Sequence, residues 1–79
     1  MKKKIDKKIY DTEKDTHIGF RYAREFGTPD GFEEQLFVTK DGQYYIYGSG
    51  GENSLYTTPA IALITDVEAV DWCKENNIL

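Results

Sequence analysis

The chain has 79 residues, of which 39% are apolar and 14% aromatic, and its formal net charge is -4. This composition indicates one small globular domain spanning residues 1–79 and excludes a disordered chain, while the small size limits the core to a few bulky side chains. A single cysteine, Cys73, excludes an internal disulfide, and a single histidine, His17, excludes a metal site built from imidazoles.

The first eight residues differ in charge from the rest of the chain. Residues 1–8 contain five lysines and one aspartate, whereas the remainder has five basic and thirteen acidic residues. This run of like charges predicts a frayed basic tail. It lacks the apolar core of a signal peptide, and no apolar run of about 18 residues follows, so we expect a cytoplasmic protein. The anionic remainder favours a protein partner with a basic surface over nucleic acid and gives no reason to expect membrane binding.

Two strands are expected before residue 30. The first is short and covers residues 8–10. From residue 17 to residue 23 the pattern alternates, which predicts a half-buried strand with Ile18, Phe20 and Tyr22 on one side. The proline, aspartate and glycine of residues 27–31 then predict a turn.

The central feature is a β-hairpin over residues 34–48, whose turn contains Asp41 and Gly42. Two registers are open. The favoured one has a three-residue loop with Gly42 in a left-handed bulge, which places Leu36, Val38, Tyr44 and Ile46 on one face and Phe37, Tyr45 and Tyr47 on the other. The alternative is a two-residue loop that pairs Leu36 and Val38 with Tyr45 and Tyr47. In both registers neither face is polar, so the sheet needs two apolar covers.

A C-terminal helix is predicted over residues 66–76. Thr65 and Glu68 form a T-x-x-E capping box, which marks a helix start. The helical period places Ala69, Trp72 and Cys73 on one stripe, and Glu68, Asp71 and Glu75 nearly opposite. We therefore expect an α+β fold, with a small antiparallel sheet of three to five strands and this helix packed on one face.

The second face of the sheet has no evident cover, and this shortfall suggests a binding surface. We expect Phe37, Tyr45 and Tyr47 to contact a partner protein or a second copy of the chain, because tyrosines suit protein interfaces. The acidic ridge formed by Glu68, Asp71 and Glu75 is a second candidate, since it can imitate nucleic-acid phosphates in a basic groove.

The remaining motifs favour structural roles over catalytic or ligand-binding roles. The glycines of residues 48–51 lack the lysine of a phosphate-binding loop and stand beside Glu52, which predicts a flexible turn or a slim loop that admits a partner's backbone. Glu33 and Glu34 are expected to be solvated. No combination of nucleophile, base and orienting acid is evident, so we expect neither an enzyme nor a cofactor or metal site.

Several segments carry a resemblance to a known group of proteins. Tyr10-Asp11-Thr12, residues 36–40 with Gly42, residues 44–51, and Glu68-Ala69 with Trp72 resemble small uncharacterised proteins of phages and other mobile elements of Gram-positive bacteria. The resemblance spans nearly the whole chain and departs at Cys73, where leucine is usual. It implies an inhibitor of a host defence protein, of the anti-CRISPR type, and carries over no catalytic or binding residue.

The leading functional hypothesis is thus a non-enzymatic protein-interaction module that acts by occlusion and is able to self-associate. The alternative is a weak single-stranded nucleic-acid binder that uses the basic tail and stacks bases on the tyrosine strip.

Overall fold

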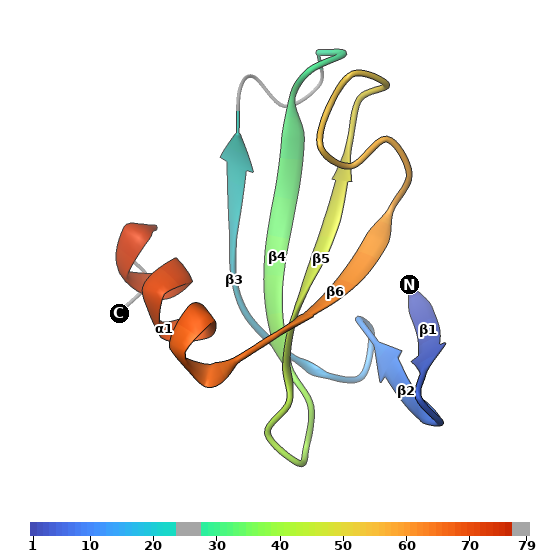
Figure 1. Ribbon diagram of the computed structural model, residues 1–79, viewed down its shortest axis with the longest axis vertical. Coiled ribbons are helices and arrows are strands. Elements are labelled where there is room, and N and C mark those ends of the chain that lie inside the picture. Colours follow the sequence, from blue (N-terminus) through green and yellow to red (C-terminus); the bar gives the residue numbers. More distant parts are fainter. Residues whose placement is uncertain (24–27, 77–79) are drawn as a thin grey trace.

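The computed structural model describes residues 1–23 and 28–76. In these residues the elements follow one another as β1 (Lys2–Ile5), β2 (Lys8–Asp11), β3 (Thr16–Ala23), β4 (Phe32–Val38), β5 (Tyr44–Gly50), β6 (Ala60–Ile64) and α1 (Asp66–Glu75). Strands β3 to β6 form an antiparallel sheet in chain order, and β1 pairs with β2 in a separate hairpin (Figure 1). The expected small α+β fold is confirmed. Among residues 1–23 and 28–76, no helix is long and apolar enough to cross a membrane.

The β4–β5 hairpin adopts the favoured register. Leu36 pairs with Ile46 and Phe37 with Tyr45. A backbone hydrogen bond of 3.0 Å from Thr39 N to the carbonyl of Gln43 closes a three-residue loop, in which Gly42 has a φ of +89°. Glycine adopts this left-handed conformation without steric penalty, so the turn itself sets the register.

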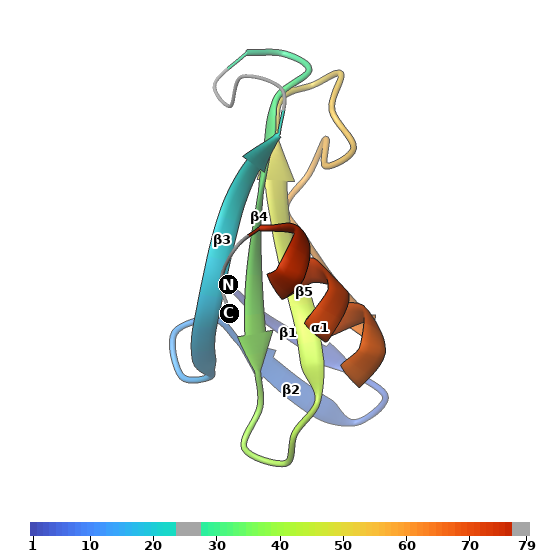
Figure 2. The same cartoon turned by 90° about the vertical axis from the view of Figure 1, so that its left-hand side faces the viewer.

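Helix α1 covers one face of the sheet, as expected. Both halves of its capping box are present: the Thr65 hydroxyl accepts a hydrogen bond from Glu68 N at 3.2 Å, and the Glu68 carboxylate accepts one from Thr65 N at 3.0 Å. The stripe of Ala69, Trp72 and Cys73 is buried against Leu36 and Ile46 of the sheet. Figure 2 shows the helix lying across the strands, with the β1–β2 hairpin behind them.

The β1–β2 hairpin covers the opposite face, so the expectation of a frayed tail over residues 1–8 is wrong. Tyr10 of this hairpin is buried with Phe37, Tyr45 and Ile61 of the sheet. The Tyr45 ring meets Tyr10 edge-on at 5.3 Å between centroids and stacks on Phe37 at 5.4 Å. The sequence pattern does not indicate this arrangement, because lysines dominate residues 1–8. The apolar residues that a strand needs on its inner face are few and widely spaced in this segment.

Strand β3 contains an irregularity that the alternating pattern concealed. Its pairing with β4 shifts between His17 and Gly19, so Ile18 packs on the helix side of the sheet. Phe20 and Tyr22 lie on the other side, are 53% and 57% exposed, and contact each other. Ile18 therefore does not share a face with Phe20 and Tyr22, because the extra residue of a bulge reverses the side on which the following residues point.

The turn of the N-terminal hairpin predicts a stabilising substitution. Asp6 and Lys7 have φ angles of 49° and 69°, a conformation that glycine tolerates much better than lysine. We expect Lys7→Gly to raise the free energy of unfolding, measured in urea, by roughly 0.5–1 kcal/mol. Lys7→Ala removes the same charge but keeps the Cβ, so it serves as the control. An equal gain in both variants would trace the effect to charge and contradict the backbone explanation.

Candidate functional site

The structure buries most of the aromatic surface that the sequence suggested as a binding site. Phe37 and Tyr45 are 3% and 0% exposed, and Tyr47 is partly buried against the same cluster. The expectation that all three are exposed for a partner is therefore wrong for Phe37 and Tyr45, because the β1–β2 hairpin fills that part of the face. The alternative of a nucleic-acid binder loses this stacking surface for the same reason.

The predicted acidic residues do come together. Glu68, Asp71 and Glu75 are exposed and line one side of a groove of about 380 Å³ between α1 and the sheet. Ile46, Ala62 and Ile64 give the groove an apolar lining, and Arg21, Glu34, Tyr56 and Trp72 complete it. We call it the acidic groove. The ridge is thus part of a concave site rather than an isolated helix face.

Glu34 lines this groove and links three parts of the chain. Its carboxylate accepts hydrogen bonds from Arg21 Nε at 2.7 Å, from Trp72 Nε1 at 3.3 Å and from the Tyr56 hydroxyl at 2.5 Å. The side chain is only 7% exposed, which corrects the expectation that Glu33 and Glu34 are both solvated. Alternate strand residues face opposite sides, so Glu34 points toward α1 while Glu33 points away.

The same contacts determine the ionisation of Glu34. Burial raises the pKa of this carboxyl. The hydrogen bonds from Tyr56, Arg21 and Trp72, together with the charge of Arg21, lower the pKa by more than burial raises it, so the net pKa is below the usual value. Burial and the nearby Glu34 carboxylate raise the pKa of Tyr56, which keeps its hydroxyl protonated as a donor. Glu34 is therefore a fixed negative charge in the groove at neutral pH.

The glycines after residue 47 make room for this arrangement. A Cβ on Gly48 would lie 2.3 Å from the Tyr56 ring, and one on Gly50 would lie 2.6 Å from the carbonyl oxygen of Gly31. Gly48 and Gly50 belong to β5, and the backbone amide of Gly51 donates to the Gly31 carbonyl at 3.0 Å. The prediction of a flexible turn is wrong for this part of the segment, because contacts within the chain use the space that the missing side chains leave.

Three acidic side chains of the groove have no cationic partner among the described residues. In residues 1–23 and 28–76 the ion pairs are Lys8–Asp41 and Arg21–Glu34, so Asp71 and Glu75 remain unpaired. Glu68 is engaged by the backbone in the capping box and also lacks a cation. Arg21, the basic residue lining the groove, is already matched by Glu34. The groove is thus suited to a positively charged occupant.

Over the described part of the chain, no three His, Cys, Asp or Glu side chains are arranged to hold a metal ion. Cys73 is buried in the helix–sheet core, and His17 is exposed and packs edge-on against Phe37.

The sequence-based prediction of the site did not include four residues of the groove: Arg21, Glu34, Tyr56 and Trp72. Of these four residues, only Glu34 could have been identified from the sequence. It occupies an inward-facing position of a central strand, and a buried charged side chain requires a partner. Comparisons with models of protein families, with curated proteins and with solved structures find no match.

Proposed function

We propose that the protein is a non-enzymatic interaction module that captures a basic segment of a partner protein in the acidic groove. The observation that carries the proposal is the combination of unpaired carboxylates, Asp71 and Glu75, with an apolar lining in one concave site. Lysine and arginine side chains match both properties, since their stems are apolar and their ends are charged.

The spacing of the acids favours an extended segment. Glu68, Asp71 and Glu75 are three and four residues apart, which corresponds to about 4.5 and 6 Å along a helix axis. Alternate residues of an extended chain are about 6.6 Å apart. A segment with basic residues at every second position therefore places successive cations beside successive acids, and the intervening side chains point out of the groove.

Such binding acts by occlusion of the partner's own surface. The anionic groove accelerates encounter with a basic surface and orients it, and the apolar lining slows dissociation. The resemblance to mobile-element proteins supplies the specific form of the proposal, in which the captured surface belongs to a host defence protein and is blocked.

The test is a titration with a fluorescent peptide that alternates lysine and serine. We expect the variant Asp71→Asn/Glu75→Gln to bind it roughly fivefold to tenfold more weakly at low salt, because two partly exposed charge pairs are lost. Added salt should weaken binding by the unmodified chain.

Glu13→Gln/Glu52→Gln is the matched control, because it changes the net charge equally at exposed positions outside the groove. We expect this control to bind the peptide nearly as well as the unmodified chain. Absence of binding, or equal weakening in both variants, would contradict a role for the groove.

A further inference from the structure

A second concave site lies beside the N-terminal hairpin. A cleft of about 570 Å³ is lined by Lys2, Lys8, Lys14 and Lys40, together with Ile9, Thr39 and three aspartates. We call it the lysine cleft. The lysines come from β1, from β2, from the turn before β3 and from the β4–β5 turn. They are distant in sequence, and the folding of the hairpin against the sheet brings them to one site.

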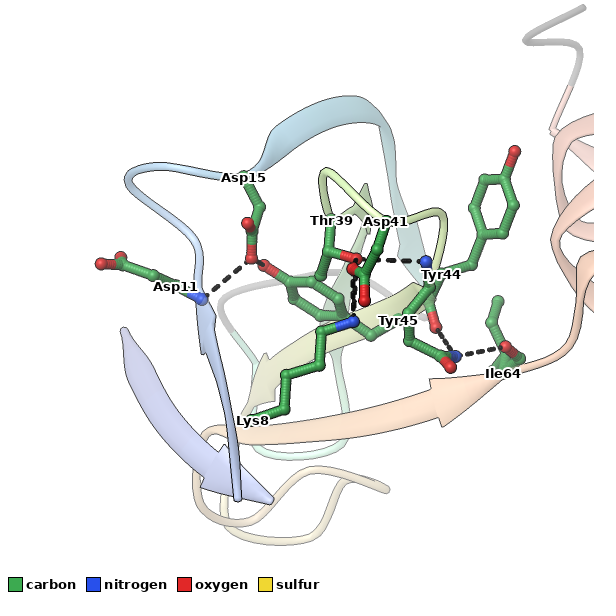
Figure 3. A network of polar contacts seen from close by, with 9 residues as sticks. Lys8, Asp11, Asp15, Thr39, Asp41, Tyr44, Tyr45 and Ile64 are labelled. Carbon is green, nitrogen blue, oxygen red and sulfur yellow. Dashed lines mark hydrogen bonds and ion pairs between the residues drawn. The ribbon is translucent and has the colours of Figure 1, made fainter. Parts of the chain in front are cut away.

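The aspartates of this cleft are held by donors of the chain itself, and Figure 3 shows the contacts of Asp15 and Asp41. Asp41 accepts hydrogen bonds from Lys8 Nζ and from the Thr39 hydroxyl, each at 2.5 Å. Asp15 accepts from the Tyr45 hydroxyl at 2.7 Å and from Asp11 N at 3.0 Å. Asp11 accepts from the backbone of the following turn, at 3.0 Å from Glu13 N. These carboxylates therefore fix the walls of the cleft.

The lysines, in contrast, are largely unmatched. Apart from Lys8, which pairs with Asp41, none of the cleft lysines forms an ion pair with any described residue. Lys3, Lys4 and Lys7 are exposed on the same hairpin and add positive charge nearby. Hydrogen bonds from Lys8 and Thr39 hold the pKa of Asp41 at about 2, so the Asp41 carboxyl stays ionised at neutral pH.

An anion that suits these lysines needs several acceptor oxygens and a high charge density. Lys2, Lys14 and Lys40 line the cleft from separate segments, and each ammonium group is a compact charge with three donors. A phosphate group presents three acceptor oxygens and up to two negative charges. Ile9, which is 54% exposed, provides an apolar surface in the cleft for an organic part of the ligand.

We propose that the lysine cleft binds a phosphate-bearing ligand, with Lys2, Lys14 and Lys40 contacting the phosphate and the Lys8–Asp41 pair holding the wall. This site is separate from the acidic groove and does not depend on the proposed capture of a basic segment. The shared chemistry is the phosphate group, and its source is either a small phosphate compound or the backbone of a single-stranded nucleic acid.

The experiment is a titration of the full chain with inorganic pyrophosphate and, separately, with a short oligothymidylate, followed by amide chemical shifts. We expect shifts at residues 14 and 40, and a dissociation constant at least about tenfold higher for Lys14→Gln/Lys40→Gln, because two charge-assisted contacts are lost. Lys3→Gln/Lys74→Gln removes the same charge outside the cleft lining and is expected to retain most of the affinity. Unfolding curves check that all variants fold.

Each outcome either overturns the proposal or supports it and identifies the source of the phosphate group. Binding of pyrophosphate without the oligonucleotide supports the site and assigns a small phosphate compound, and tighter binding of the oligonucleotide supports it and assigns nucleic acid. Shifts no larger than those caused by sodium chloride at equal ionic strength overturn the proposal. Equal weakening in the cleft variant and in the control also overturns it, because binding would then reflect overall charge.

Discussion

Replacing Phe37 with alanine is expected to lower the free energy of unfolding by about 3–5 kcal/mol, as is typical of a large aromatic side chain removed from a core. The Phe37 ring is 3% exposed and stacks on Tyr45, which is itself fully buried. A domain of this size has a total stability of roughly 4–12 kcal/mol. The variant should therefore be close to unfolding at room temperature, as a urea denaturation curve will show.

Phe20→Ala is the matched control for this change. Phe20 points to the same side of the sheet but is 53% exposed, beyond the part that the hairpin covers. We expect a loss of less than about 1 kcal/mol. Similar losses in the two variants would mean that the N-terminal hairpin does not seal the face, and the sequence-based expectation of an exposed Phe37 would then stand.

Glu34→Ala should also destabilise the protein, by about 3 kcal/mol. The change leaves the Tyr56 hydroxyl and the Trp72 indole N–H without their acceptor and removes the carboxylate that neutralises Arg21. The adjacent Glu33 has no such role, since it is hydrogen-bonded to Gln35 on the other side of the sheet. Glu33→Ala is expected to change stability by less than about 0.5 kcal/mol. A Glu34 variant as stable as this control would refute the stabilising role of these three contacts.

The pH dependence of stability gives an independent measure of the same carboxylate. Its pKa in the folded chain is below the ordinary value of 4.5, so its contribution is complete above that value and is lost as the pH falls through the lowered pKa. The difference in unfolding free energy between the unmodified chain and Glu34→Gln should therefore shrink as the solution is acidified from neutral pH. A difference that stays constant below pH 4.5 would contradict the lowered pKa.

Local features of this protein follow from its sequence alone. The capping box at Thr65 and Glu68 and the bulged turn at Gly42 depend on residues within a few positions of one another, and both form as predicted. The requirement for two covers follows from the same local information. The strands of the hairpin carry apolar side chains on both faces, and neither apolar face is stable when exposed to water.

The tertiary structure decided which segments provide the covers and where the sites lie. The alternation of apolar and polar residues does not identify the basic N-terminal segment as the second cover of the sheet. That segment has few apolar residues to face the sheet, and lysines dominate its composition. Glu34 meets Trp72, 38 positions away, only when α1 crosses the sheet, and no local pattern encodes that meeting. The acidic ridge was visible in the sequence, whereas its groove and the lysine cleft exist only because long-range packing places separate segments side by side.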